Sequence, residues 1–333
     1  MIGREMQQLV RKFRGKRIAV WGDLILDEYI TTCAARVSRE APVLITEFES
    51  DDFRLGGAGN VAANIRALGG EPHPIGFVGR DQSGDILRDV LSRSGIPDDG
   101  LLAVKDFITP RKTRILSGDQ HTRRQQVLRI DRLNRSPLPE QHHANLLDQL
   151  EKVLKDSSFL VISDYLCCSV REKDYHSARK RFDFPPVAVD SRRHLRSFPD
   201  VRIATPNLTE LQRIFPATEF NREADFIGAA IDLHREINSD GLLLKRGDEG
   251  MVLLESSRPP TRIGIYGPLE IVDVTGAGDT VIALLSLGLA SGADMLACAR
   301  LAAVAAGLTV MKAGAATVTP DELIHALSTG TLP

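Results

Sequence analysis

The feature that most restricts the fold of this chain is a regular alternation between short apolar runs and amphipathic helical patterns. The runs with the length and composition of buried strands are residues 17–22, 75–78, 159–163, 187–190, 203–205 and 241–245. Helical patterns occur at residues 58–68, 84–94, 140–155, 172–181, 223–237 and 295–311. Strands that alternate with helices predict an α/β fold with a mainly parallel sheet, covered by helices on both faces.

Two segments, residues 28–50 and 109–132, interrupt this alternation. Both are rich in Thr, Val, Ile, Arg and Gln, and their apolar residues alternate instead of following a helical period. This pattern predicts an antiparallel ribbon in each segment. We expect the ribbons to form a small β-lid inserted into the α/β domain. Two surface hairpins without a function are the alternative.

Length and composition exclude several classes of protein. The chain has 333 residues, of which 43% are hydrophobic, so it can form one large α/β domain or two smaller ones. Its formal net charge of −2 gives no electrostatic basis for binding nucleic acid or an anionic membrane. Residues 1–16 lack the apolar core of a signal peptide, and the apolar stretch around residues 301–311 is too short to span a bilayer.

The cysteines indicate a reducing compartment. They show no metal-ligand spacing, and two of them are adjacent, which disfavours a disulfide between those two. We therefore expect a cytoplasmic protein with reduced thiols. The four residues are Cys33, Cys167, Cys168 and Cys298.

A glycine-rich string near the C-terminal end carries the strongest chemical signal. Residues 273–280 are Asp-Val-Thr-Gly-Ala-Gly-Asp-Thr, and they lie between an apolar run at 269–272 and another at 281–290. This order predicts a strand, a tight turn and a helix. The backbone N–H groups of residues 276–278 (Gly276, Ala277 and Gly278) would then face one point at a helix N-terminus, where a phosphate can bind without a side chain.

Asp279 follows these N–H groups in the first turn of the predicted helix. Phosphoryl transfer to a hydroxyl needs an anion site beside a carboxylate, because the backbone stabilises the transferred charge while the acid accepts the proton. We predict that Asp279 is the catalytic base, with a pKa kept low by the helix N-terminus. Two alternatives are a helix start that only favours an acid, and a dinucleotide-binding turn.

A second glycine turn, Leu-Gly-Gly-Ala-Gly-Asn at residues 55–60, also leads into a helix. The amide of Asn60 offers both a donor and an acceptor, which suits a sugar hydroxyl better than a phosphate. A close-packed helix start capped by Asn60 is the alternative. The two turns, in this order and at this separation, resemble the paired signatures of the ribokinase-like (PfkB) sugar kinases. The matching positions are Gly56, Gly57, Asn60 and Ala62, and residues 273–279.

This resemblance covers residues 22–320 and implies a three-layer α/β/α domain with a β-lid over the sugar. We expect one kinase domain over residues 1–333, without a fused nucleotidyltransferase domain, because the sequence pattern leaves no residues for a second catalytic domain. The implied reaction transfers the γ-phosphoryl group of Mg–ATP to a sugar hydroxyl.

Further strings are similar to one branch, the kinases of D-glycero-β-D-manno-heptose 7-phosphate, which phosphorylate the anomeric hydroxyl on the route to ADP-heptose. These strings are residues 22–29, 36–43, 161–165, 205–210 and 273–281. The chain departs from the branch at residues 166–168, where Leu-Cys-Cys replaces Ala-Lys-Gly, and at residues 190–193, where Asp-Ser-Arg-Arg replaces Asp-Pro-Lys-Gly. Another sugar, sugar phosphate or nucleoside therefore stays open as the acceptor, as does a non-catalytic sugar or nucleotide sensor.

The resemblance also implies roles for individual residues. The expected substrate-binding residues are Asp27, Gly56, Gly57, Asn60, Arg111 and Asp164. The expected nucleotide-binding residues are Asn207, Glu210, Lys245, Gly247, Gly250 and Thr275. Glu210 would bind Mg²⁺ through water, because Mg²⁺ keeps several of its waters. A capping box formed by Asn207 and Glu210 is the alternative. A monovalent cation near Asp273 is a further possibility of this family.

The lid carries an unusual density of cations. If the acceptor already bears a phosphate, the candidates to bind it are Arg111, Lys112, Arg114, Arg123, Arg124 and Arg193. Charged lid edges that prevent aggregation are the alternative. The edge strands of the lid would leave backbone N–H and C=O groups unpaired, and a second subunit could cover them. We therefore expect a homodimer formed through residues 28–50 and 109–132.

Overall fold

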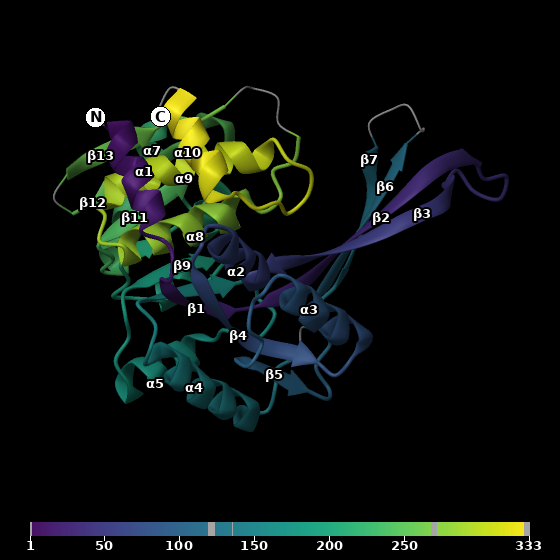
Figure 1. The fold of residues 1–333 in the computed structure, drawn as a ribbon, viewed down its shortest axis with the longest axis horizontal. Coiled ribbons are helices and arrows are strands. Elements are labelled where there is room, and N and C mark those ends of the chain that lie inside the picture. Colours follow the sequence, from purple (N-terminus) through teal and green to yellow (C-terminus); the bar gives the residue numbers. More distant parts are fainter. Residues whose placement is uncertain (1, 119–123, 135, 257, 268–271, 330–333) are drawn as a thin grey trace.

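A nine-stranded sheet lies at the centre of the molecule (Figure 1). The computed structural model describes residues 2–118, 124–134, 136–256, 258–267 and 272–329. In spatial order, the strands are β13 (Arg258–Ile263), β12 (Met251–Glu255), β11 (Gly241–Lys245), β10 (Ile203–Ala204), β9 (Val187–Ser191), β8 (Phe159–Asp164), β1 (Arg17–Gly22), β4 (Glu71–Gly79) and β5 (Leu101–Val104).

The strand directions confirm the predicted, mainly parallel sheet. All neighbouring pairs from β11 to β5 are parallel, whereas β11–β12 and β12–β13 are antiparallel. Strands β12 and β13 and the short edge strand β5 were not predicted from the sequence. A 3₁₀ turn at Gly247–Glu249 joins β11 to β12.

Helices cover both faces of the sheet, because strand side chains alternate between two apolar cores. Ile18 and Val20 of β1 belong to one core, whereas Ala19 and Trp21 belong to the other. The helices of the first core are α1 (Ile2–Arg11), α2 (Ala58–Ala67), α3 (Gln82–Arg93), α8 (Ala277–Ala290), α9 (Met295–Val310) and α10 (Pro320–Thr329). Those of the second core are α4 (Glu140–Leu154), α5 (Glu172–Arg181), α6 (Leu208–Ile214) and α7 (Glu223–Glu236). The three-layer α/β/α arrangement is therefore confirmed.

The lid is a separate four-stranded sheet that projects from the main body (Figure 1). Its order is β3 (Leu44–Gly57), β2 (Leu24–Val37), β6 (Arg111–Gly118) and β7 (Gln125–Arg132). β2–β3 and β6–β7 are the two predicted antiparallel ribbons. A parallel pairing of β2 with β6, which the sequence analysis did not anticipate, joins them into one sheet. Because β2 begins two residues after β1 ends, the lid starts at the carboxyl edge of the central sheet.

The predicted helices agree closely with the observed ones. α5 spans its predicted range, and α2, α4, α7 and α9 each end one residue earlier than expected. α3 begins two residues early, because the Asp81 side chain caps it by accepting a hydrogen bond from the Gly84 N–H. The strand expected at residues 269–272 lies, except for Val272, outside the described residues.

The N-terminal helix α1 was not predicted. It lies beside α10, and Gln7 Nε2 donates a hydrogen bond to Ser328 Oγ at 2.9 Å (Figure 1). Met6, Leu9 and Val10 of α1 are buried in the first core, so the charged leader forms an amphipathic helix that completes this layer. No helix in the described part of the chain has the length and apolarity needed to cross a bilayer.

Candidate active site

The glycine turn before α8 brings the two signature strings together. Gly276 caps α8 in the left-handed region, at φ 83°, so this position strongly favours glycine. A Cβ on Gly276 would lie 2.6 Å from Asn60 Nδ2. Glycine therefore allows both the turn and the approach of Asn60, which α2 supplies from the first signature.

Asp279, in the first turn of α8, is held by two neutral donors. Asn60 Nδ2 donates a hydrogen bond to Asp279 Oδ2 at 2.8 Å, and the Tyr165 hydroxyl donates to Asp279 Oδ1 at 2.8 Å. Asp279 is only 5% exposed. Its carboxylate is thus fixed in position by residues from α2 and from the loop after β8.

The expectation of a low pKa for Asp279 is wrong. Burial raises its pKa to about 6, although the hydrogen bonds from Asn60 and Tyr165 act in the opposite direction. Desolvation of the charged carboxylate therefore outweighs the stabilisation expected at a helix N-terminus. A carboxylate with this pKa is ionised at neutral pH and is a stronger base than an exposed aspartate.

The residues predicted to bind substrate lie where the lid meets the sheet. Asp27 of β2 is buried and forms an ion pair with Arg114 of β6 at 2.7 Å. A Cβ on Gly56 would lie 2.6 Å from Asp27 Oδ2, so glycine leaves room for this carboxylate. Arg111 is paired with Glu28 of β2. Asp27 and Arg111 are therefore held by charged partners inside the lid, and their role as sugar ligands stays a prediction.

Asp164, the last residue of β8, organises the neighbouring loops. It is 1% exposed and accepts hydrogen bonds from the Leu166 N–H at 2.9 Å and the Ser191 hydroxyl at 2.6 Å. His194 Nδ1 lies 3.2 Å from the same carboxylate. These contacts describe a residue that positions the loops after β8 and β9, and direct binding of a sugar by Asp164 stays a prediction.

A cavity of about 360 Å³ lies beside the N-terminus of α8. Four of the predicted nucleotide-binding residues line it, and two (Glu210 and Thr275) do not. The four are Asn207, Lys245, Gly247 and Gly250. Ala277 and Gly278 line it too, so the predicted anion site of α8 faces this cavity. Its wall is largely apolar, with Ile265, Tyr266, Val281, Ala303, Ala306 and Val310 among its residues.

Lys245, on the polar side of the cavity, lies near the charges of Asp190 and Glu210, two acids that do not line the cavity themselves. Lys245 Nζ lies 2.9 Å from Asp190 Oδ2, at the carboxyl ends of β11 and β9. Burial acts to lower the pKa of Lys245, but the charges of Asp190 and Glu210 outweigh it, so the pKa is raised. Lys245 therefore stays protonated and can interact with an anion.

Asn207 and Glu210 form the capping box of α6 that the sequence left as an alternative. Asn207 Oδ1 accepts from the Glu210 N–H at 2.8 Å, and Glu210 Oε2 accepts from the Asn207 N–H at 2.9 Å. Burial and the nearby charge of Asp190 raise the pKa of Glu210. The capping contact does not test whether Glu210 also binds Mg²⁺ through water. Among the described residues, no cluster of three or more His, Cys, Asp or Glu side chains could hold a metal ion.

Comparisons with known proteins place this site in a family. Residues 16–322 match the pfkB family of carbohydrate kinases. The chain belongs to this family. It is therefore a sugar kinase, and the matched range includes both glycine turns.

Similar proteins support this assignment. "Bifunctional protein HldE" of Citrifermentans bemidjiense is 35% identical over 98% of this chain and 66% of its own length. The kinase thus spans about two thirds of that relative.

Phosphofructokinase-2 from Escherichia coli, solved with substrates and products, is similar in structure, with a TM-score of 0.75 and 19% identity over 94% of this chain and 98% of that one. Arabidopsis thaliana ribokinase, solved with ribose and ATP, has a TM-score of 0.70 and 19% identity over 94% and 99%. The ribokinase-like fold is confirmed.

Three residues of the kinase's site were missed as functional candidates. Tyr165 contacts Asp279, Asp190 pairs with Lys245, and Asp23 binds the loop that carries Tyr165. A signal for the two aspartates was present, because Asp23 follows β1 and Asp190 lies near the end of β9. Carboxyl ends of parallel strands meet at one edge of a sheet, where such folds bind ligands.

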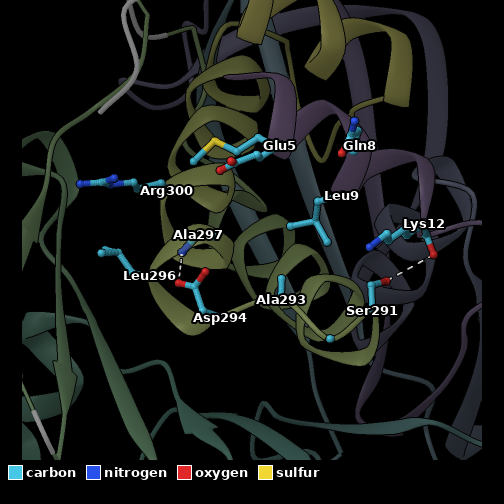
Figure 2. Close-up of a pocket in the computed structure, with 12 residues that line it drawn as sticks. Glu5, Gln8, Leu9, Lys12, Ser291, Ala293, Asp294, Leu296, Ala297 and Arg300 are labelled. Carbon is cyan, nitrogen blue, oxygen red and sulfur yellow. Dashed lines mark hydrogen bonds between the residues drawn. The ribbon is translucent and has the colours of Figure 1, made fainter. Parts of the chain in front are cut away.

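A second cavity, of about 450 Å³, lies between α1 and the loop that joins α8 to α9 (Figure 2). None of the predicted site residues lines it. Asp294 accepts a hydrogen bond from the Ala297 N–H as the cap of α9, and Ser291 donates to the Lys12 carbonyl at 3.3 Å. These polar groups maintain local structure, and the cavity is separate from the kinase site.

Proposed function

We propose that this kinase transfers the γ-phosphoryl group of Mg–ATP to the anomeric hydroxyl of D-glycero-D-manno-heptose 7-phosphate. One observation carries the proposal: Asp279 is held between Asn60 and Tyr165, at a helix N-terminus that faces a cavity suited to a nucleotide. The similarity to the relative named HldE and the strings shared with the heptose branch support this acceptor.

In the proposed reaction, the acceptor hydroxyl lies against the carboxylate of Asp279. The oxygen of this hydroxyl attacks the γ-phosphorus, its proton passes to Asp279, and the bond between the γ-phosphorus and the leaving ADP oxygen breaks. The backbone N–H groups of residues 276–278 would stabilise the charge of the transferred group, although that of Ala277 donates to the Val274 carbonyl at 3.3 Å in this structure. Lys245, which lines the cavity, would add a positive charge on the nucleotide side. Asn60 keeps the carboxylate oriented during transfer.

The residues around the cavity are suited to a nucleotide. Its apolar wall suits a flat base, and the glycines at 247 and 250 suit a close backbone approach. Mg²⁺ prefers oxygen ligands and keeps several waters, so Glu210 would hold it through water while phosphate oxygens supply the remaining ligands. Bound there, Mg²⁺ would neutralise phosphate charge. A monovalent cation near Asp273 is also proposed, and the Thr275 and Gly314 N–H groups already bind that carboxylate.

We further propose that residues 1–333 act as one kinase domain and that two copies associate through their lids. Large apolar side chains exposed on the lid support association. Phe48 is 66% exposed, Val37 65% and Leu128 51%. Apolar side chains on open strands favour burial against a second copy.

An ADP-release assay with a panel of acceptors tests the function. We expect turnover with heptose 7-phosphate well above that with neutral sugars, nucleosides or other sugar phosphates. Efficient turnover of another panel member would change the acceptor but leave the kinase assignment intact. ATP and sugar binding without any ADP release would instead favour the sensor.

A further inference from the structure

The cationic side chains of the lid differ in their ion-pair partners, and Arg123 lies outside the described residues. Arg111, Arg114 and Arg124 are each paired with a carboxylate of the lid, from Glu28, Asp27 and Glu49. Their charge is thus already neutralised. No ion pair between described residues involves Lys112 or Arg192.

Lys112 and Arg192 instead contact one aromatic ring. Lys112 Nζ lies 5.0 Å from the centroid of the Tyr165 ring, and Arg192 Cζ lies 4.4 Å from it. Lys112 comes from lid strand β6, whereas Arg192 follows β9 of the central sheet. The Tyr165 ring therefore brings together two cations from the two parts of the molecule.

This arrangement has an electrostatic cost. Lys112 is only 8% exposed, and burial lowers its pKa, as does the nearby positive charge of Arg192. The charges of Asp27 and Asp279 act on Lys112 in the opposite direction, but its pKa stays below the ordinary value. A bound anion would reduce the repulsion between the two cations and raise the pKa of the buried lysine.

The same tyrosine reaches the proposed base. The Tyr165 hydroxyl donates a hydrogen bond to Asp279 Oδ1 at 2.8 Å, while the ring of the same residue contacts Lys112 and Arg192. A ligand that extends along this side chain would have a hydroxyl at Asp279 and a negative group at Lys112 and Arg192. An acceptor sugar with a phosphate remote from its reacting hydroxyl has this form.

We propose that Lys112 and Arg192, arranged on the Tyr165 ring, bind the phosphate of a phosphorylated acceptor. This inference rests on the proposed function and names the part of the site that selects phosphorylated over neutral sugars. It also separates these two cations from the paired arginines of the lid, which would maintain the lid structure.

The test compares two acceptors, heptose 7-phosphate and its dephosphorylated form. Lys112→Met and Arg192→Met should each lower kcat/KM for the phosphorylated acceptor by about 10- to 100-fold, the usual range for a charged hydrogen bond. Efficiency with the neutral form should change by less than about threefold. Matched controls are Lys152→Met, an exposed lysine of α4, and Arg179→Met, whose guanidinium stacks on Phe184 away from the site.

Equal losses on both acceptors, or no loss on either, would overturn the phosphate site. A wild-type enzyme that phosphorylates neither acceptor would contradict the proposed function, and a binding measurement then decides this inference separately. With a non-hydrolysable ATP analogue at saturation, inorganic phosphate should raise the melting temperature of wild type and Lys152→Met but not of Lys112→Met. An equal rise in Lys112→Met would also overturn the proposal.

Discussion

At the scale of single residues, the site depends on how Asp279 is held. Burial gives it a pKa of about 6, and two neutral donors keep its orientation. The base must be ionised to accept a proton. We therefore predict that kcat is constant near neutral pH and falls as the pH drops below about 6. A profile without an acidic limb between about pH 5 and 7 would contradict this protonation state.

The variant Tyr165→Phe should shift the acidic limb of the kcat–pH profile to higher pH. The phenol hydrogen bond stabilises the ionised carboxylate and lowers the pKa of Asp279, so its removal raises the pKa. One such bond is worth about 0.5–1.5 kcal/mol, which corresponds to a shift of roughly 0.5–1 pH unit. The limb should appear at higher pH in kcat profiles of the variant. Tyr175→Phe, which removes a hydroxyl bonded to the Pro199 carbonyl, is the control and should leave the limb in place.

The glycine spacing predicted the two tight turns that carry Asn60 and Asp279, because such turns require glycine locally. The structure brings these two side chains into contact, but the spacing did not predict the pKa of Asp279. The pKa of Asp279 depends on residues that cover it from elsewhere, including Tyr165, which is 114 positions away in the chain. Burial of this kind is a property of the packed fold and leaves no mark in the local sequence.

At the scale of elements, the loop after β8 is positioned by a buried carboxylate. Asp23 accepts hydrogen bonds from the N–H groups of Tyr165, Cys167 and Ser169, at 2.8–2.9 Å. Leu166 and Cys168, between them, adopt positive φ values of 65° and 80°, so the loop is held in a conformation that most residues disfavour. Burial, followed by the charge of Asp164, raises the pKa of Asp23 to about 6.

We predict that Asp23→Ala destabilises the protein by at least about 2 kcal/mol, because three N–H groups, two of them buried, lose their acceptor. It should also lower kcat, since Tyr165 would no longer be held against Asp279. Denaturant unfolding measures the first effect and steady-state kinetics the second. Asp240→Ala, which removes a surface ion pair with Arg202, should cost less than about 1 kcal/mol. Equal free energies of unfolding for Asp23→Ala and Asp240→Ala would rule out the proposed role of Asp23 in holding the loop after β8.

The lid illustrates a second limit of sequence reasoning. Alternation predicted both antiparallel ribbons, because period-two patterns are local. The parallel pairing of β2 with β6 joins residues more than 80 positions apart, such as Leu26 and Arg111, and no short-range pattern indicates it. That pairing brings Lys112 into the site beside the sheet.

At the scale of the whole molecule, the lid leaves an open edge. Every residue of β7 is exposed, including Val127 at 50% and Leu128 at 51%. We predict a dimer at micromolar concentration that the double variant Phe48→Glu/Leu128→Glu converts to a monomer, because buried unpaired carboxylates are costly. Light scattering measures the mass. The control Gln141→Glu adds a charge on α4, away from the lid, and should leave the dimer intact. A wild-type protein that is monomeric at micromolar concentration would contradict association through the lid.

We propose that Asp279, which the turn before α8 places beside the cavity, is the base for phosphoryl transfer. The variant Asp279→Asn tests this role. We predict that kcat falls by about 10²–10⁴, the usual contribution of a positioned acid–base group, while ATP affinity changes by less than about threefold. The melting temperature at neutral pH should not fall, because the substitution removes a buried charge whose pKa is raised to about 6. A folded variant that retains more than about a tenth of the wild-type kcat would exclude Asp279 as the base.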